Sequence, residues 1–357
     1  MPNTAINGFG RIGRAALKIA LQKGANVVAI NDLTNARILA HLLKYDSAYG
    51  IYDKEILIEE DGKTAKLADQ HGEKDFFKQT GAKNFLIVDG KRIQVTSEKD
   101  PAKLPWKELN VDVVLECTGR FTENDSAKAH ILAGAKKVVV SAPTKGGVEQ
   151  TFLLGVNSDK YFNQEIVSNA SCTTNCISPI VGIMHAKFRV LKSLMTTVHA
   201  ITAEQNNVDG PPPPLHPDMR RARASSFNMV PTTTGTAKAT TEAIPDLKGL
   251  FDGIAIRVPI ITGSLSDITM VLGKKTTVEE VNNTFLQAKE KPFYKGIIDA
   301  TYEPIVSSDI IGSTFSAIVD LSMTKVVDGD LVKILAWYDN EWGYTNRLVE
   351  MAMLVAQ

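Results

Sequence analysis

The sequence predicts an α/β protein with an amino-terminal doubly wound parallel sheet and a second, α+β domain built on a mostly antiparallel sheet. Three patterns support this fold. Residues 3–30 form a strand, a glycine-containing turn, a helix and a second strand. Apolar strands at 111–116 and 137–141 flank a helix near 125–132. After Ser171 the β-rich segments become longer and are linked by hairpin-like turns, which is typical of antiparallel sheets.

The first unit combines two periodicities. Residues 3–7 alternate as a short buried strand and residues 27–30 form the next strand. Ile12, Ala16 and Ile19 recur on one side of the helix between them. Two strands joined by one helix imply parallel pairing with a right-handed crossover. Residues 53–100 are charged and interrupted by glycine, so we expect short strands or a hairpin at the edge of this domain.

The change in pattern also predicts the domain boundaries. The first domain is expected at 1–171 and the second at 172–340. A carboxy-terminal helix, expected at about 346–356 within the segment 341–357, packs back on the first domain. The prolines at 211–214 are stiff and extended, and they lie in a long loop. The strands predicted for the second domain are 191–201, 251–261, 266–272, 316–321 and 331–338, and its clearest amphipathic helix is 278–289.

Composition argues against several classes of protein. The 357 residues are enough for two domains, and the apolar content of 44% is ordinary for a globular chain. Forty basic and forty acidic side chains cancel, so no global field favours nucleic acid or an anionic membrane. Three cysteines, no signal-peptide pattern and no apolar run of about 18 residues argue against a secreted or membrane protein. We therefore expect a cytoplasmic protein.

Gly8, Gly10 and Gly13 form a G-x-G-x-x-G pattern between the first strand and the helix, which is typical of a Rossmann-type dinucleotide-binding turn. The first glycine permits the tight turn, the second lets backbone approach the pyrophosphate, and the third lets the helix pack closely. Asp32 ends the second strand, where a carboxylate can accept both ribose hydroxyls of adenosine. Alternatively, Asp32 caps the helix expected at 36–43.

The segment Ser171-Cys-Thr-Thr-Asn-Cys176 precedes an apolar helical stretch at 177–186, so Cys172 is expected at or near a helix N-terminus. A thiol at a helix N-terminus is expected to have a lowered pKa and to lie beside N–H groups that can hold an oxyanion. Cys176 is expected to pack in the core, and no second Cys/His pair at ligand spacing supports a metal site. A nucleophilic cysteine needs a base. His199, at the end of a long strand, is one of several candidates, and a structural histidine is the alternative.

Four motifs stand out along the chain. They are Asn7-Gly-Phe-Gly-Arg-Ile-Gly-Arg14, Ser168-Asn-Ala-Ser-Cys-Thr-Thr-Asn-Cys176, Thr232-Thr-Thr-Gly-Thr-Ala-Lys238 and Trp337-Tyr-Asp-Asn-Glu-Trp-Gly-Tyr344. In this order they closely resemble the phosphorylating glyceraldehyde-3-phosphate dehydrogenase family, and the similarity extends over nearly the whole chain.

The resemblance implies a cytoplasmic homotetramer that uses NAD, glyceraldehyde 3-phosphate and inorganic phosphate. Cys172 matches the family's nucleophile and His199 its base. The resemblance implies that Thr202 and Arg257 bind the substrate's own phosphate and that Asn340 binds the nicotinamide carboxamide. The residues implied for the rest of NAD are Gly8, Gly10, Arg11, Ile12, Gly13 and Asp32. Those implied for the attacking inorganic phosphate are Ser171, Thr173, Arg221, Thr234 and Gly235.

In the implied mechanism the thiolate attacks the aldehyde, a hydride leaves, and inorganic phosphate releases the thioester as 1,3-bisphosphoglycerate. Two alternatives compete with this interpretation. Erythrose-4-phosphate dehydrogenases share the nucleophile but generally depart at the positions of Thr202 and 234–235, and turnover on the two sugars discriminates directly. A binding or scaffolding protein that has lost catalysis, contacting RNA through its dinucleotide fold, is opposed by the intact set of functional residues.

The sequence also departs from the family's usual pattern. The segments 59–84 and 211–214 are longer than in most family members, and no recognisable motif in them indicates what they do. Glu204 and Asn206 stand where many members have a hydroxyl or a lysine, which makes the rim of the phosphate pocket less positive. No cation follows Asp32 until Arg37, so NAD is expected to be preferred over NADP.

Overall fold

A computed structural model of the chain describes residues 1–67, 83–123, 125–147, 150–212 and 218–357. The chain divides into two compact units. Unit 1 comprises Met1–Gln150, Phe162–Ser168 and Leu348–Gln357, and unit 2 comprises Thr151–Tyr161 and Asn169–Arg347. Within the described ranges, no helix has the length and apolar character needed to cross a membrane.

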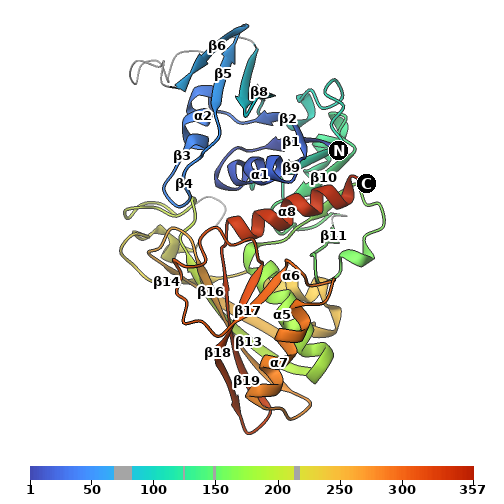
Figure 1. Ribbon diagram of the computed structural model, residues 1–357, viewed down its shortest axis with the longest axis vertical. Coiled ribbons are helices and arrows are strands. Elements are labelled where there is room, and N and C mark those ends of the chain that lie inside the picture. Colours follow the sequence, from blue (N-terminus) through green and yellow to red (C-terminus); the bar gives the residue numbers. More distant parts are fainter. Residues whose placement is uncertain (68–82, 124, 148–149, 213–217) are drawn as a thin grey trace. The chain divides into compact units, whose positions relative to one another are not determined.

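Unit 1 is built on one sheet, whose described strands have the order β11-β12-β10-β9-β1-β2-β8-β7-β5-β6 (Figure 1). From β12 to β8 neighbouring strands run parallel. From β8 to β6 they run antiparallel. The strands are β1 Asn3–Asn7, β2 Asn26–Asn31, β5 Ile56–Glu60, β6 Lys63–Lys66, β7 Asn84–Val88, β8 Lys91–Thr96, β9 Val113–Glu116, β10 Lys137–Val140, β11 Gln150–Thr151 and β12 Ile166–Ser168.

The elements of unit 1 confirm the predicted strand–helix–strand unit at its start and the edge strands expected within 53–100. Residues 68–82 of that segment lie outside the described residues. A buried apolar cluster that includes Trp106, Val114 and Val138 forms one part of the core. The helices are α1 Arg11–Gln22, α2 Ala36–Lys44 and α4 Lys128–Leu132, and a small two-stranded sheet is formed by β3 Tyr45–Asp46 and β4 Gly50–Ile51.

Unit 2 contains a second sheet, with its described strands in the order β14-β15-β13-β16-β19-β18-β17. The β13–β15 and β17–β18 pairs are parallel, and the other pairs are antiparallel. This confirms the prediction of a mostly antiparallel second domain. The strands are β13 Val190–Ala200, β14 Val230–Thr233, β15 Phe251–Val258, β16 Ser264–Leu272, β17 Ile298–Thr301, β18 Ala317–Val327 and β19 Leu331–Tyr338.

One face of this sheet is covered by α5 (Cys172–Phe188), α6 (Thr236–Ala243) and α7 (Val278–Lys289), as Figure 1 shows. Buried and partly buried residues alternate along β16, which is the pattern of a sheet with one packed face. The core on the packed face includes Ile180, Met270 and Phe285. The bounds of α7 agree with the prediction to the residue, because its 3.6-residue periodicity is strong and Thr277 caps its start.

The last helix, α8 (Trp342–Val355), begins four residues before the predicted 346–356. The Asp339 carboxylate explains the earlier start, because its Oδ1 accepts hydrogen bonds from the backbone N–H groups of Glu341 and Trp342 at 2.9 and 2.8 Å. These bonds satisfy donors that a helix N-terminus otherwise leaves without partners. Residues from Leu348 onward group with unit 1, where Lys23 forms an ion pair with Glu350 at 2.9 Å.

Candidate active site

Two of the three glycines of the predicted dinucleotide turn have a steric reason to be glycine, and the third borders open space. Gly8 has a φ of +89°, and a Cβ there would lie 2.7 Å from the backbone nitrogen of Thr118. A Cβ on Gly13 would lie 2.1 Å from the carbonyl oxygen of Gly8, so this glycine lets α1 pack on the turn. A Cβ on Gly10 would meet nothing within 4 Å. Gly10 therefore borders open space, as a glycine facing a ligand should.

Helix α1 begins at that open space. Gly10 is its N-cap residue and provides no capping side chain, and Arg11 and Ile12 are the first two helical residues. The Arg11 side chain donates to Asp46 Oδ2 at 2.7 Å. A helix N-terminus without a side-chain cap, with glycine beside it, favours a phosphate group through its N–H groups and dipole. The residues present therefore fit a dinucleotide.

Asp32 lies against the glycine turn and does not cap α2. Its Oδ2 accepts a hydrogen bond from the backbone N–H of Phe9 at 2.7 Å, and its Oδ1 accepts one from Thr34 N–H at 3.1 Å. The N-cap of α2 is Asn35, whose side chain accepts from Ile38 N–H. The alternative interpretation of Asp32 as the helix cap is therefore wrong, because the chain continues through a turn before the helix starts.

Cys172 is the first residue of α5, as predicted. Ser171 is the N-cap, and its hydroxyl accepts a hydrogen bond from Thr174 N–H at 3.1 Å. The Cys172 Sγ atom lies 3.3 Å from Nε2 of His199, the last residue but one of β13. The structure therefore brings the cysteine together with His199, one of the several candidate bases. Cys176 is buried in the core, as predicted for this second cysteine.

The expected lowering of the Cys172 pKa is wrong for this structure. Burial raises the pKa of the Cys172 thiol, and the opposing effects of Arg257 and the Thr173 hydroxyl do not offset it. The helix N-terminus still favours a negative sulfur, but an enclosed thiolate loses hydration that a solvent-exposed one keeps. Ionisation of Cys172 therefore depends on a neighbouring proton acceptor.

Hydrogen-bond partners fix the tautomer of His199. Nδ1 of His199 lies 2.7 Å from the carbonyl oxygen of Ala200. Nη1 of Arg257 lies 2.9 Å from Nδ1, and it also donates to the Ala200 oxygen at 3.0 Å and to Thr202 Oγ1 at 3.1 Å. We assign the proton to Nδ1, because the Ala200 oxygen is its shortest contact and can only accept. The lone pair of Nε2 is left facing the Cys172 thiol.

The surroundings of His199 keep this imidazole neutral. Burial, assisted by the guanidinium of Arg257, holds the pKa of His199 well below its ordinary range. The residue is only 3% exposed. A neutral imidazole with an acceptor atom beside a thiol is the form that can take a proton from it.

Two guanidinium groups lie near this pair. Arg257 reaches Thr202 through the bond already described, and Arg221 donates from Nε to Thr232 Oγ1 at 3.0 Å and from Nη1 to Glu204 Oε1 at 3.1 Å. Burial raises the pKa of the Glu204 carboxyl, but hydrogen bonding with Thr202 and the charges of Arg257 and Arg221 bring the net pKa below its usual value. Arg257 and Arg221 form a positive cluster suited to phosphate oxygens, with Glu204 as a negative group inside it.

Hydroxyl groups connect α5 to the start of α6. Thr234 and Thr236 hydroxyl oxygens lie 2.8 Å apart, and Ser171 Oγ lies 3.4 Å from Thr236 Oγ1. Gly235 is the N-cap of α6 and has open space around its Cβ position. The predicted residues Ser171, Thr234 and Gly235 are thus close together, and the sequence analysis did not identify Thr236 as their link.

A second hydroxyl chain holds Thr173. Its Oγ1 lies 2.9 Å from the Tyr338 hydroxyl, which lies 2.7 Å from Thr197 Oγ1. Tyr338 is 1% exposed, and its ring meets the His199 ring edge-on at 6.0 Å between centroids. Tyr338 and Thr197 were not predicted as site residues, although the alternation of strands β13 and β19 places both on the packed face.

Asn340 is buried and its amide orientation is fixed. Its Oδ1 accepts from Gly263 N–H at 3.1 Å and from the Ser264 hydroxyl at 2.9 Å, and the Thr262 hydroxyl lies 3.3 Å away. Because donors surround the oxygen, the NH2 group is the end that points elsewhere. Asn340 can thus offer an amide donor to a carbonyl group.

Comparison with known proteins places both units in one family. Residues 2–72 and 63–124 match "Glyceraldehyde 3-phosphate dehydrogenase, NAD binding domain", and residues 171–340 match "Glyceraldehyde 3-phosphate dehydrogenase, C-terminal domain". A glyceraldehyde-3-phosphate dehydrogenase of Streptomyces coelicolor is 47% identical over 354 residues, which cover 98% of this chain and 97% of that protein. The protein of this name from Borreliella burgdorferi is 46% identical over 356 residues, with 98% of each chain covered. That from Geobacillus stearothermophilus is 45% identical over 354 residues, with 98% and 97% covered. The chain belongs to the glyceraldehyde-3-phosphate dehydrogenase family.

Proposed function

We propose that this chain oxidises glyceraldehyde 3-phosphate to 1,3-bisphosphoglycerate, using NAD and inorganic phosphate, through a thioester on Cys172. The observation that carries the proposal is the 3.3 Å approach of Cys172 Sγ to His199 Nε2, with the His199 proton held on Nδ1. A thiol at a helix N-terminus beside a neutral imidazole can be deprotonated at the moment it attacks a carbonyl carbon.

The protein side chains then act in two stages. As Cys172 Sγ bonds to the aldehyde carbon, its proton passes to His199 Nε2. His199 then donates this proton to the carbonyl oxygen, which gives a thiohemiacetal. His199 takes the hydroxyl proton back when the hydride leaves the same carbon, and a thioester remains. An oxygen of inorganic phosphate attacks the thioester carbon, the C–S bond breaks, and the Cys172 thiolate is restored.

NAD, when bound, supplies the acceptor for the hydride. Its pyrophosphate would lie at the glycine turn and the start of α1, formed by Gly8, Gly10, Arg11, Ile12 and Gly13. The carboxylate of Asp32 would accept hydrogen bonds from the adenosine ribose. The NH2 group of Asn340, oriented by its three neighbouring donors, would hold the nicotinamide carboxamide oxygen.

Two phosphate-binding groups are proposed around Cys172. Arg257 and Thr202, already joined at 3.1 Å, would bind the phosphate of the aldehyde. The attacking phosphate would meet hydroxyl, backbone and guanidinium donors, which are the usual partners of a phosphate oxygen. These donors are Ser171, Thr173, Arg221, Thr234 and Gly235.

We further propose a cytoplasmic homotetramer in which residues 1–171 bind NAD and residues 172–340 carry the chemistry. The polar, proline-rich loop at 205–223 is proposed to lie at a subunit boundary; residues 213–217 of it lie outside the described residues. Light scattering at micromolar concentration tests the assembly: a mass of four chains is expected, and a monomer would refute it.

A substrate comparison tests the proposed activity. Formation of NADH should require inorganic phosphate for sustained turnover, and kcat/KM should be higher with glyceraldehyde 3-phosphate than with erythrose 4-phosphate. Prior reaction with iodoacetate should abolish turnover and label Cys172. Turnover that is independent of phosphate, or that survives alkylation of Cys172, would contradict the proposal.

A further inference from the structure

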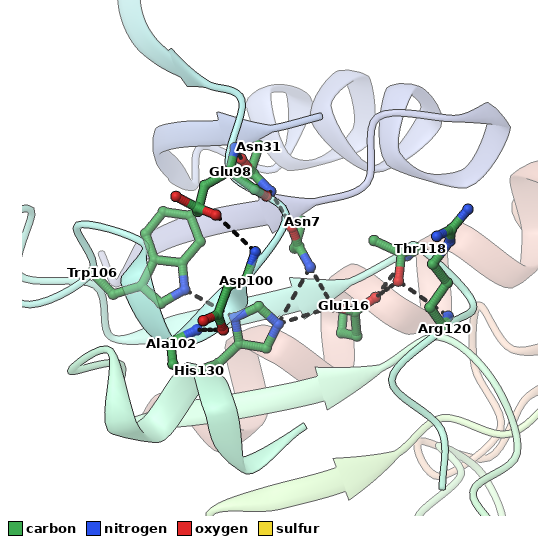
Figure 2. Close-up of polar contacts among 10 residues, drawn as sticks. All are labelled: Asn7, Asn31, Glu98, Asp100, Ala102, Trp106, Glu116, Thr118, Arg120 and His130. Atoms are coloured by element: carbon green, nitrogen blue, oxygen red, sulfur yellow. Dashed lines mark hydrogen bonds and ion pairs between the residues drawn. The ribbon is translucent and has the colours of Figure 1, made fainter. Parts of the chain in front are cut away.

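Four neighbouring strands of unit 1 each have a polar side chain as their last residue. In the sheet register, Asn7 of β1 pairs with Glu116 of β9 and with Asn31 of β2, and Asn31 pairs with Thr96 of β8. Register partners in parallel strands point to the same face, so these side chains form a row. We call this row of Glu116, Asn7, Asn31 and Thr96 the polar ladder; Figure 2 shows its first three members.

The hydrogen bonds of the polar ladder all run in one direction. Thr96 Oγ1 donates to Asn31 Oδ1 at 2.9 Å, Asn31 Nδ2 donates to Asn7 Oδ1 at 2.7 Å, and Asn7 Nδ2 donates to Glu116 Oε2 at 2.6 Å. The backbone of Glu98 fixes the Asn31 amide independently, because its N–H meets Oδ1 and its carbonyl meets Nδ2, both at 2.9 Å. Both amides thus turn their positive ends toward Glu116.

The partners of Glu116 require an ionised carboxylate. Trp106 Nε1 can only donate, so His130 Nδ1, 3.0 Å away, is an acceptor, and the neutral imidazole carries its proton on Nε2. His130 Nε2 therefore donates to Glu116 Oε2 at 2.9 Å. The other carboxylate oxygen accepts from Thr118 N–H at 2.7 Å and from its hydroxyl at 2.5 Å. Four donors, counting Asn7, converge on a carboxylate whose side chain is 0% exposed.

This carboxylate lies where the sheet topology reverses. Since β1 stands between β9 and β2, the chain leaves β1 toward one side and later returns through β9 on the other. Such a switch point is where open α/β sheets bind ligands. Gly8 follows Asn7 directly, and its missing Cβ would lie 2.7 Å from Thr118 N. Glu116 therefore holds both neighbours of Gly8, Asn7 in sequence and Thr118 in space.

We propose that Glu116 is a positioning residue for the dinucleotide turn. Its buried charge fixes Asn7 and Thr118, and through them the backbone around Gly8, in the arrangement that admits a pyrophosphate. His130 and Trp106 supply the donor on the far side of the carboxylate, as Figure 2 shows. This inference rests on the proposed use of the turn for NAD, but it concerns a fully buried carboxylate that is not among the residues proposed to bind the cofactor.

The first test is Glu116→Gln, with NAD affinity measured by titration calorimetry. The new NH2 group faces donors, and the remaining oxygen cannot accept all four hydrogen bonds, so Asn7 or Thr118 must move. We expect the Kd for NAD to rise on the order of 10- to 100-fold, the scale expected when a binding group is misplaced by about 1 Å. In the NAD-free protein, the amides of residues 8–13 should exchange hydrogen faster than in the wild type.

A remote pair of variants separates positioning from general stability. His130→Leu removes the donor to Glu116, whereas His130→Gln places a side-chain NH2 group where Nε2 was. The leucine variant should lose NAD affinity and the glutamine variant should recover most of it. The matched control is Val138→Ala, which opens a cavity in the same core and removes no hydrogen-bonding group from the polar ladder. Its Tm should fall while its Kd for NAD stays within about twofold of the wild-type value.

Each outcome decides one point. If folded Glu116→Gln binds NAD as the wild type does, or if Val138→Ala loses as much affinity as His130→Leu, Glu116 is structural and the inference fails. If Glu116→Gln does not fold, the His130 pair decides alone: recovery by glutamine supports the inference, and equal Kd values for the two variants overturn it. A wild-type protein that does not bind NAD would instead refute the proposed function.

Discussion

His199 in unit 2 and His130 in unit 1 are both buried imidazoles, with 3% and 0% of their surfaces exposed. The donor and acceptor roles of the two ring nitrogens are reversed between these histidines. Nδ1 of His199 donates to a carbonyl oxygen and leaves the Nε2 lone pair facing a thiol, whereas Nδ1 of His130 accepts from Trp106 and its Nε2 donates to a carboxylate. Burial is common to both, so the partner of Nδ1 decides which histidine can act as a base.

The two regions also differ in how completely their polar groups are hydrogen-bonded. Around Glu116 four donors point at the two carboxylate oxygens, and a site of this kind resists change. Around Cys172, burial works against ionisation of the thiol, so the Cys172–His199 pair remains a thiol and an imidazole until a substrate arrives. Mutations in the first region should therefore act on cofactor binding, and mutations in the second on chemistry.

Removing the thiol should have the largest effect on activity. Cys172→Ser should abolish dehydrogenase activity, because a serine hydroxyl is a far weaker acid and one imidazole cannot ionise it near neutral pH. NAD binding should be largely unchanged, since unit 1 retains its turn. Turnover above trace level, measured as NADH formation, would show that Cys172 is not the nucleophile.

Removing the base should have the next largest effect. His199→Asn should lower kcat by about 10²- to 10⁴-fold, the usual cost of a missing acid–base group, and should slow alkylation of Cys172 by iodoacetamide. His130→Gln is the matched control, because it alters an equally buried histidine that does not face the thiol. Equal losses of alkylation rate in the two variants would contradict the assignment of different roles.

Arg257→Ala tests the positive cluster beside the base. The kcat/KM for glyceraldehyde 3-phosphate should fall about 10- to 100-fold, the range for a charged hydrogen-bonding partner. Unphosphorylated glyceraldehyde lacks the group that Arg257 is proposed to bind, so its kcat/KM should change much less. Because Arg257 also reaches the Ala200 carbonyl beside His199, equal losses on both substrates would show that it supports the base instead.

Asp32→Ala should have the smallest of these effects and concerns the cofactor side of the comparison. The wild type should favour NAD over NADP by at least about tenfold, because a carboxylate repels a 2′-phosphate. Arg37 forms an ion pair with Glu60 and is thus already engaged. The variant should narrow the preference mainly by gaining on NADP. If the ratio of kcat/KM with NAD to kcat/KM with NADP does not change, Asp32 only accepts the hydrogen bond from Phe9 N–H and does not select the cofactor.

The sequence predicted those parts of the fold that depend on local pattern. The glycine turn, α1 and α7 follow from residue spacing and capping within about 15 residues. The polar ladder could not be found this way, because Asn7 and Glu116 are 109 residues apart and meet only through the register of β1 and β9. Nothing in the local sequence around His130 distinguishes a donor to a buried carboxylate from a surface histidine.

For the candidate site too, the sequence predicted the residues within motifs but not the properties that depend on tertiary structure. Cys172 was identified by its place before a helix, and family resemblance singled out His199 from six histidines. The direction of the Cys172 pKa shift was wrong, because enclosure of the thiol is a tertiary property that motif reasoning does not contain. Tyr338 and Thr236 were missed for a related reason: their hydroxyls reach the site across long sequence separations of 165 and 65 residues.

The central claim is that Cys172 carries the acyl group between oxidation and phosphate attack. The most direct test incubates the whole protein with glyceraldehyde 3-phosphate and NAD without inorganic phosphate, quenches it in acid, and measures the mass of the peptide that contains Cys172. A phosphoglyceroyl adduct on that peptide, lost when inorganic phosphate is added before the quench, is the predicted result. Turnover with phosphate but no adduct on Cys172, or an adduct that phosphate does not remove, would contradict it.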